Sequence, residues 1–521
     1  MSTQTNPPAP SPETPAAAAR MAGLLALGQD GHAEGAAVPK LATGISGFDH
    51  VAMGGLPVRR ATVVAGQSGS AKTLFAAQFL AEGVRLGQPG VFVTLEEPAA
   101  DLRANLRTLG WDVESWEAAG DWRFVDASPL ITGGQPHIDV DTLAAQIGHA
   151  VDATGAERLA VDSVSAVLSL QPDATVARLM LRRLVAALRR MGLTVVLTLE
   201  TPGDPGGALS AYGVEEFVAD NVVLLRNVRE GGFRRRTVEV LKMRGAMHHK
   251  GDVPFTVVPG RGLVVLPVTS PRVRPNPALR RDSSGISGLD ELTHGGLFRA
   301  SSTLISGPTG TGKTLLATQI AAAGAAQGDT VLIIAYEESR AQVLANGRTS
   351  GHDLAAYEAA GLLHIVSVYP EVAGLDDHLV EIRELIDRLQ PSRVVIDSLS
   401  ALERLGSEQN YRGFVIALTS FVRTAGVALF LTATTSQLFG GASVTESHTS
   451  GLIDTIMVLR HVETGSELRR GIVVLRMRGS GHEHQIRELS VGPSGVTIGA
   501  PFVGLGGVLT GAPTSVEARI P

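Results

Sequence analysis

The sequence predicts an α/β protein made of two tandem copies of one domain, each a mostly parallel sheet flanked by helices. Three observations predict this fold: segments repeat along the chain, short apolar runs alternate with helical stretches, and each copy places a glycine-rich loop between an apolar run and a helix. Strand, loop, helix and strand in this order give parallel strands joined by crossover helices. The length, 521 residues, also suggests two or three domains.

Six segments of the first half recur in the same order in the second half. The pairs are TGISGFD (43–49) and SGISGLD (284–290), GGL (54–56) and GGL (295–297), GQSGSAKT (66–73) and GPTGTGKT (307–314), LEE (95–97) and YEE (336–338), VDSVS (161–165) and IDSLS (396–400), and LKMRG (241–245) and LRMRG (475–479). The first four pairs share one offset, and the later drift is what loop insertions produce. A period this long indicates duplicated domains rather than a solenoid.

The repeat and the composition together set the expected boundaries. A Pro/Ala-rich tail covers 1–38, the first domain 39–267, a proline-rich linker 268–281, the second domain 282–501 and a C-terminal tail 502–521. The predicted strands are 61–65, 91–95, 158–161 and 194–199 in the first domain, and 303–306, 331–335, 394–396 and 428–432 in the second. Helices are expected over 74–85 and 315–325, directly after the glycine-rich loops.

The composition excludes several classes of protein. Hydrophobic residues make up 44% and charged residues 18%, as in soluble globular proteins. The net charge of −6 gives no basic excess that would indicate nucleic acid as a partner. Without cysteine there are no disulfides, thiolate metal sites or cysteine nucleophiles. No apolar run approaches the roughly 18 residues of a membrane span, and no signal peptide is recognised, so we expect a cytoplasmic protein.

Each glycine-rich loop has the pattern of a phosphate-binding P-loop. Its backbone N–H groups and the following helix N-terminus attract phosphates, its lysine reaches the terminal phosphates, and its threonine hydroxyl ligates Mg²⁺. The second loop matches fully, whereas Ala71 replaces the last glycine of the first loop. The expected ATP-binding residues of these loops are Gly66, Ser68, Gly69, Ser70, Ala71, Lys72, Thr73 and Leu74, and Gly307, Thr309, Gly310, Thr311, Gly312, Lys313, Thr314 and Leu315.

Carboxylates follow two further strands of each copy. The pairs Glu96–Glu97 and Glu337–Glu338 are the candidate catalytic residues, because a carboxylate there can activate water or a hydroxyl beside the γ-phosphate. The alternative is a solvated charge pair at a strand end. Asp162 and Asp397 stand where a Walker B aspartate would hold Mg²⁺, and the alternative is a buried structural aspartate. The expected metal-binding residues are Thr73, Asp162, Thr314, Glu337 and Asp397.

In each copy, one basic segment stands at the end of a late strand. Lys242 and Arg244 in the first copy, and Arg476 and Arg478 in the second, are candidates for stabilising charge on the γ-phosphate of a neighbouring subunit. Surface salt bridges are the alternative. The histidines that follow share no metal-ligand spacing between the two copies, so phosphate contact or ring stacking is expected of them rather than zinc binding.

With these motifs the sequence resembles the KaiC family of double-domain RecA-like ATPases. The resemblance extends over about 40–515 and is most specific in SVTESHTSGLIDTI (443–456), together with AYEESR (335–340) and RMRGS (476–480). It implies a homohexamer with ATP bound between subunits, a first domain that hydrolyses ATP and a second domain that autophosphorylates on serine or threonine, in clock-like or stress signalling. Glu96 would then activate water, and Glu337 would accept the proton of the acceptor hydroxyl.

The resemblance also implies residues that reach the ATP of the next subunit. They are Lys242, Met243, Arg244 and His248 in the first domain, and Arg470, Arg476, Met477, Arg478, Ser480 and His482 in the second.

Two departures from the family pattern change the expectations. The family's phosphorylated Ser-Thr pair is Ser450-Gly451 here, so Ser450 is the expected phosphoacceptor, with Thr445 as the competing site. The tail after 511 differs from the tail that engages a KaiA-type activator, so such an activator is not expected. A KaiB-like protein or a histidine-kinase signalling protein remains a candidate partner.

Two other functional classes remain open alternatives. A RecA-like DNA motor would need basic or aromatic DNA-binding loops, and the loop 202–208, PGDPGGA, is neither. A nucleotide-gated scaffold with little turnover would keep the P-loops but lose hydrolysis.

Overall fold

The computed structural model of the chain describes 38–128, 140–171, 173–201, 218–230, 232–267, 280–435, 449–464, 466–503, 505–506 and 514–515. Almost all of the expected N-terminal tail, 1–38, and most of the expected linker, 268–281, and of the C-terminal tail, 502–521, lie outside these residues. The expected domain limits therefore stay predictions.

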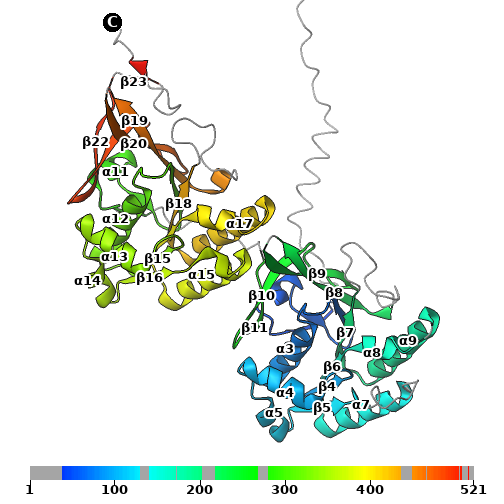
Figure 1. Cartoon of the computed structure of the whole chain (residues 1–521). Helices are drawn as coiled ribbons and strands as arrows, with labels where there is room; N and C mark the ends of the chain where they lie inside the picture. The colour runs from blue at the N-terminus through cyan, green and yellow to red at the C-terminus, as the bar shows by residue number, and fades with distance from the viewer. Residues whose placement is uncertain are drawn as a thin grey trace, which may run out of the picture.

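Two lobes of the same architecture lie side by side (Figure 1), the first running from blue to green and the second from yellow-green to red. The sheet of the first lobe has nine strands in the order β11-β10-β9-β8-β3-β7-β6-β4-β5. Their bounds are β3 Ala61–Gly66, β4 Gly90–Thr94, β5 Trp122–Asp126, β6 Arg158–Asp162, β7 Thr194–Glu200, β8 Asn221–Glu230, β9 Phe233–Met243, β10 Val253–Val258 and β11 Gly262–Val265.

The sheet of the second lobe repeats this topology in the order β16-β15-β17-β18-β14-β19-β20-β21-β22. Its strands are β14 Ser302–Gly307, β15 Val331–Ala335, β16 Leu363–Ser367, β17 Arg393–Asp397, β18 Ala428–Thr434, β19 Thr455–Thr464, β20 Glu467–Met477, β21 Arg487–Gly492 and β22 Gly495–Pro501. Two-stranded pairs add β1 Lys40–Leu41 with β2 Leu56–Pro57, β12 Arg281–Asp282 with β13 Leu297–Phe298, and β23 Leu505–Gly506 with β24 Thr514–Ser515.

Helices flank both sheets (Figure 1). In the first lobe they are α2 Phe48–Val51, α3 Lys72–Arg85, α4 Ala99–Thr108, α5 Val113–Ala119, α7 Val140–Thr154, α8 Val164–Leu168 and α9 Ala174–Arg190. In the second they are α11 Ser287–Leu292, α12 Lys313–Ala326, α13 Arg340–Thr349, α14 Leu354–Ala359, η1 Pro370–Val372, α15 Leu375–Leu389, α16 Leu399–Glu403, α17 Glu408–Ala425 and η2 Thr449–Leu452. No helix within the described ranges combines the length and the apolarity that crossing a bilayer requires.

The predicted α/β fold is confirmed, and the predicted strands agree with the observed ones to within two residues at each end. The strands from β3 to β7, and β8 beside β3, pair in parallel. The strands from β8 to β11 pair antiparallel and form a part of the sheet that the sequence analysis did not resolve. This extension carries the basic segments discussed below.

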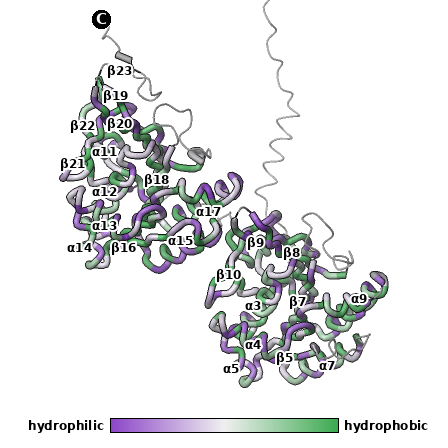
Figure 2. Tube along the Cα trace, in the orientation of Figure 1, coloured by the Kyte–Doolittle hydropathy of each residue, from purple (hydrophilic) through white to green (hydrophobic). Residues whose placement is uncertain are grey.

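The central parallel strands of each sheet are buried on both faces, as expected of parallel strands covered by helices. Successive residues of β3 enter different cores, with Val63 packed among α7 and α9 residues and Val64 against α3. Leu304 and Ile305 divide in the same way in the second lobe. Figure 2 shows hydrophobic and hydrophilic residues alternating along the surrounding helices, in line with one buried and one exposed face.

A buried arginine at the start of β6 and β17 ties the strands to the helix after each P-loop. Arg158 donates to the carbonyl oxygens of Phe79 (2.7 Å) and Ala42 (2.8 Å), and Arg393 donates to those of Ile320 and Ser283 (3.2 Å each). A helical glycine makes room for each arginine. A Cβ at Gly83 would lie 2.6 Å from Arg158 Cδ, and one at Gly324 would lie 2.7 Å from Arg393 Cδ. The duplicated chain thus kept the arginine and its glycine together.

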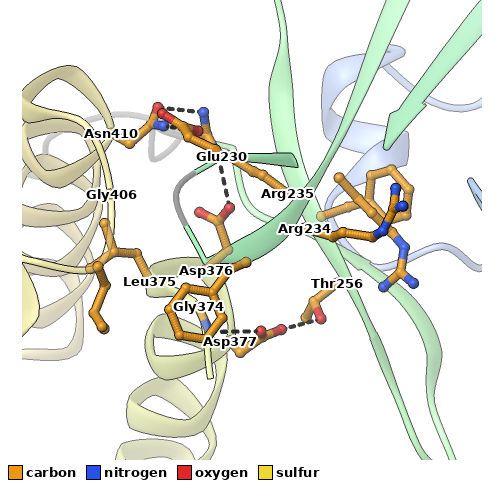
Figure 3. A pocket seen from close by; sticks show the side chains of 14 residues that line it. Glu230, Arg234, Arg235, Thr256, Gly374, Leu375, Asp376, Asp377, Gly406 and Asn410 are labelled. Atoms are coloured by element: carbon orange, nitrogen blue, oxygen red, sulfur yellow. Dashed lines mark hydrogen bonds and ion pairs between the residues drawn. The ribbon is translucent and has the colours of Figure 1, made fainter. Parts of the chain in front are cut away.

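The lobes contact each other between β9–β11 of the first and α15 and α17 of the second (Figure 3). Arg235 on β9 pairs with Asp376 on α15, Nε to Oδ2, at 3.0 Å, and also donates to Asn410 on α17. Burial raises the pKa of Asp376, and Arg235 counteracts that rise. Val264 and Leu266 join the hydrophobic core of the second lobe. The interface therefore combines apolar contact with a partly buried ion pair.

We expect Arg235→Ala to weaken this interface by about 2 kcal/mol, because it leaves the Asp376 carboxylate without its charged partner. Hydrogen exchange should become faster in β9, β10 and α15 and stay unchanged in α3 and α12. Arg261→Ala is the matched control, since the Arg261–Glu384 pair (2.8 Å) is 49% and 39% exposed and such pairs contribute little. Equal exchange in Arg235→Ala and wild type would contradict the assigned role of the pair.

Candidate functional site

Each glycine-rich loop connects a buried central strand to the N-terminus of a helix. β3 ends at Gly66 and α3 begins at Lys72, while β14 ends at Gly307 and α12 begins at Lys313. The two predicted loops therefore lie at the carboxyl ends of parallel strands, which is where open α/β sheets bind ligands. The remaining residues expected to bind ATP in these loops, from Ser68 to Leu74 and from Thr309 to Leu315, lie in the connections and in the first helical turns.

The residue before each lysine adopts the left-handed conformation, which turns the chain into the helix. Gly312 has φ 97° and ψ 19°, and Ala71 has φ 70° and ψ 30°. A Cβ costs about 1 kcal/mol in this conformation. The surroundings allow it, because a Cβ on Gly312 would lie at ordinary contact distances from Leu489 (3.6 Å) and Val491 (3.7 Å). Ala71 therefore preserves the path of the loop.

The two P-loop lysines have the same setting. Lys72 Nζ donates to the carbonyl oxygen of Gln67 at 3.0 Å, and Lys313 Nζ donates to that of Pro308 at 2.9 Å. Burial lowers the pKa of both ammonium groups, while nearby carboxylates oppose this change. A buried cation that contacts mainly a backbone carbonyl is suited to receive phosphate oxygens.

The two glutamates of each acidic pair have different partners. Asn105 on α4 donates to Glu97 Oε1 at 2.7 Å, and its counterpart Asn346 on α13 donates to Glu338 Oε2 at 2.9 Å. The other glutamate of each pair, Glu96 or Glu337, is among the carboxylates that act on the P-loop lysine. The asparagine therefore holds one glutamate of each pair away from that lysine and leaves the first of the two as the nearer candidate base.

Glu96 has a further contact that distinguishes the two copies. Ser163 Oγ donates to Glu96 Oε1 at 2.8 Å, whereas the equivalent Ser398 hydroxyl is buried without a partner in the described part of the second lobe. Burial raises the pKa of Glu96, the Ser163 hydrogen bond lowers it, and the Asp162 and Glu200 carboxylates raise it.

The Walker B candidates end β6 and β17, next to the acidic pairs. Thr198 donates to Asp162 and Thr432 donates to Asp397 in the same way. The described residues contain no preformed group of three metal-binding side chains. Mg²⁺ in ATP sites takes one or two carboxylates together with phosphates and water, so the predicted set fits such an ion.

The late basic segments lie at the opposite end of each sheet from the P-loop. Met243 pairs with Asn221, which is level with Thr62 near the start of β3, about four residues and roughly 13 Å from Gly66. Arg244 N donates to the carbonyl oxygen of Asp220 at 3.2 Å. These side chains therefore do not face the P-loop of their own lobe.

The same arrangement recurs in the second lobe. Arg478 N donates to the carbonyl oxygen of Asp454 at 3.1 Å, as Arg244 N does to that of Asp220. Met477 pairs with Thr455, which is level with Thr303 near the start of β14. The remaining predicted contact residues of these segments follow or precede these strand ends: Lys242, His248, Arg476, Ser480 and His482.

Arg470 differs from the other predicted contact residues because it lies beside its own P-loop. Its Nε donates to the carbonyl oxygen of Gly310 at 3.0 Å, and its strand partner His461 approaches the carbonyl oxygen of Thr309 at 3.2 Å. The first lobe repeats this contact with Arg236 and Asn227, which both donate to the carbonyl oxygen of Gly69.

Of these P-loop neighbours only Arg470 was predicted to contact nucleotide, whereas His461, Asn227, Arg236 and also Glu200 were not predicted. Glu200 ends β7 and lies 3.9 Å from Lys72, Oε1 to Nζ. The antiparallel pairing of β8 with β9 brings Asn227 and Arg236 to the loop, and the sequence has no local signal for that pairing. Glu200 could have been found, because it follows a predicted strand as the other site carboxylates do.

The expected phosphoacceptor Ser450 lies in the short helix η2, a helix that Arg478 contacts through the backbone. Arg478 Nη2 donates to the carbonyl oxygen of Gly451 at 2.7 Å, and Arg423 Nη2 donates to Asp454 Oδ1 at 3.0 Å. The competing site, Thr445, lies outside the described residues.

A strand, a glycine-rich loop ending in lysine, a helix and carboxylates on neighbouring strands together define a P-loop ATPase, and the chain contains this site twice. The sequence profile of the KaiC ATPase matches 41–270 and again 283–502. The chain belongs to the KaiC family, and as a member of this family it binds nucleotide and has two tandem RecA-like domains.

Curated relatives support this assignment over almost the whole length. The circadian clock protein KaiC3 of Synechocystis sp. is 46% identical over 480 residues, which cover 91% of this chain and 95% of the relative. The circadian clock oscillator protein KaiC of Thermosynechococcus vestitus is 44% identical over 485 residues, covering 92% and 93%. That of Synechococcus elongatus is 42% identical over 491 residues, covering 93% and 94%.

We expect Gly312→Ala to leave ATP binding at the second P-loop within tenfold of wild type, or about 1.4 kcal/mol, because the added Cβ meets only ordinary contacts. The free energy of unfolding should fall by about 1 kcal/mol. Ala71→Gly is the reciprocal variant. Its free energy of unfolding should change little, because relief of the strained left-handed alanine offsets the greater entropy of glycine in the unfolded chain. Loss of ATP binding in Gly312→Ala, measured by titration calorimetry, would instead indicate that Ala71 disables the first loop.

Proposed function

We propose that the first domain hydrolyses ATP and that the second domain autophosphorylates the protein on serine, in clock-like or stress signalling. The observation that carries this proposal is the repeated site, in which a buried P-loop lysine faces a glutamate and an aspartate from two neighbouring strands. The relatives named as circadian clock proteins support the signalling role.

In the first site, Glu96 takes the proton of an attacking water while the bond between the γ-phosphorus and the β–γ bridging oxygen breaks. Its raised pKa makes it a stronger base than an ordinary glutamate, and Ser163 orients its carboxylate. Lys72 holds the terminal phosphates. Mg²⁺ would be held by Thr73 and, through water, by Asp162, and it would neutralise the developing charge on the phosphates.

In the second site, Glu337 takes the proton of a seryl hydroxyl, and Lys313, Thr314 and Asp397 hold Mg-ATP in the same manner. The acceptor is Ser450 of a neighbouring subunit. A serine hydroxyl is a weak nucleophile, so transfer depends on its position beside the γ-phosphate and on the base.

We also propose that the chain assembles into a homohexamer, and the position of the basic segments supports contact with a neighbouring subunit. Arg244 and Arg478 lie at the end of the sheet opposite to the P-loop of their own lobe, so in the assembly they would reach the ATP site of an adjacent subunit rather than their own. A KaiB-like or histidine-kinase protein is the proposed class of signalling partner. The similarity to KaiC proteins over more than nine-tenths of the chain does not favour a DNA motor.

Lys313→Ala should abolish the transfer of phosphate to the protein, because it removes the cation that holds the terminal phosphates of ATP. Lys72→Ala is the matched variant in the other lobe and should mainly reduce phosphate release. Both are measured with γ-labelled ATP, as label on the chain and as free phosphate. Full protein labelling in Lys313→Ala would contradict the assignment of the kinase to the second domain.

Ser450→Ala should remove most of the phosphate that wild-type protein incorporates, since Gly451 beside it offers no hydroxyl. Phosphosite mapping by mass spectrometry checks this result, with Thr445→Ala as the control at the competing position. Nucleotide binding must stay intact in both variants. Incorporation at the wild-type level in Ser450→Ala would exclude this serine as the main acceptor.

A further inference from the structure

Besides the differences described above, the two ATP sites differ in the residue that ends the strand next to the P-loop strand. Glu200 ends β7 beside Gly66, and Thr434 ends β18 beside Gly307. The backbone contacts are the same, because Glu200 N donates to Ser165 Oγ at 2.7 Å and Thr434 N donates to Ser400 Oγ at 2.9 Å. The two side chains therefore occupy equivalent places beside the P-loops.

Glu200 adds a carboxylate to the first site that the second site lacks. Its Oε1 lies 3.9 Å from Lys72 Nζ, and Glu200, Asp162 and Glu96 all act on that lysine. Among the described residues of the second lobe, Asp397 and Glu337 are the carboxylates that act on Lys313. The Glu200 side chain is 51% exposed, whereas that of Lys72 is buried, so water and a bound phosphate can reach the Glu200 carboxylate beside the lysine.

We propose that Glu200 is a specificity-determining and positioning residue that makes water, rather than a side-chain hydroxyl, the nucleophile of the first site. This inference rests on the proposed division between hydrolysis and phosphotransfer. A water molecule has two protons and can donate to Glu96 and to Glu200 at once. A seryl hydroxyl has one proton and can donate to only one of the two carboxylates. The other carboxylate would then face the negative γ-phosphate without a hydrogen-bond donor.

The water oxygen bonds to the γ-phosphorus as the bond from phosphorus to the bridging oxygen breaks, and ADP keeps that electron pair. One water proton passes to Glu96. The other O–H donates to Glu200 throughout and stays on the phosphate that is released. In the second site, neutral Thr434 leaves one carboxylate base, Glu337, which matches the single proton of a hydroxyl.

The test compares Glu200→Gln and Glu200→Thr in full-length protein that also carries Glu337→Gln, so that phosphate release reports on the first site. We expect kcat for release of phosphate from Mg-ATP to fall by about tenfold or more, because the water loses one of its two acceptors. KM should not rise, since a negative charge beside the phosphates is also removed. The exposed Glu157→Gln is the matched control and should keep the parental kcat.

The reciprocal variant Thr434→Glu, in otherwise wild-type protein, should shift the second site from transfer toward hydrolysis. The ratio of phosphate incorporated into the protein to free phosphate released should then fall by about tenfold. An unchanged kcat with a lower KM in Glu200→Gln would overturn the inference, because Glu200 would then only repel ATP. A wild-type chain that never labels itself would refute the autokinase proposal, while the kcat of the Glu200 variants would still decide the role of Glu200.

Discussion

The structure depends on one local constraint, the left-handed residue that places a lysine at the first position of the helix after each P-loop. This turn directs the lysine back to the loop carbonyl, Gln67 in the first lobe and Pro308 in the second, and opens the helix N-terminus toward the ligand. The buried ammonium group then needs anions. The carboxylates at the ends of neighbouring parallel strands balance part of its charge, and ATP supplies the remainder.

A second constraint fixes the helix that carries this lysine. The buried Arg158 and Arg393 hold carbonyl oxygens of α3 and α12, and the glycines at 83 and 324 make room for their side chains. Removing either arginine would take away the side-chain donor to a carbonyl oxygen of the P-loop helix and leave a cavity beside the helical glycine. The same pair of residues in both lobes explains why the P-loop geometry survived duplication, even where alanine replaced the last glycine of the first loop.

The fold and the loops could be predicted from the sequence because they depend on local patterns. The apolar runs, the glycine-rich loops and the carboxylates after strands appear in order along the chain, and the repeat allowed each pattern to be checked against its copy. The contacts of Arg236 and Arg470 with the P-loops could not be predicted, because they depend on the antiparallel extension of the sheet and on its register. The pair Arg235–Asp376 joins residues 141 positions apart in different lobes, and no local pattern indicates it. Glu200 could have been noticed by aligning the two copies, because the equivalent residue of the second copy is Thr434.

The central claim is that both P-loops of this KaiC-family chain work as nucleotide sites and that a few side chains give them different reactions. The most direct measurement is native mass spectrometry of the full-length protein in Mg-ATP, which gives the number of subunits and of bound nucleotides together. We predict a hexamer with two nucleotides bound to each chain. One nucleotide per chain, or a monomer at saturating Mg-ATP, would contradict it.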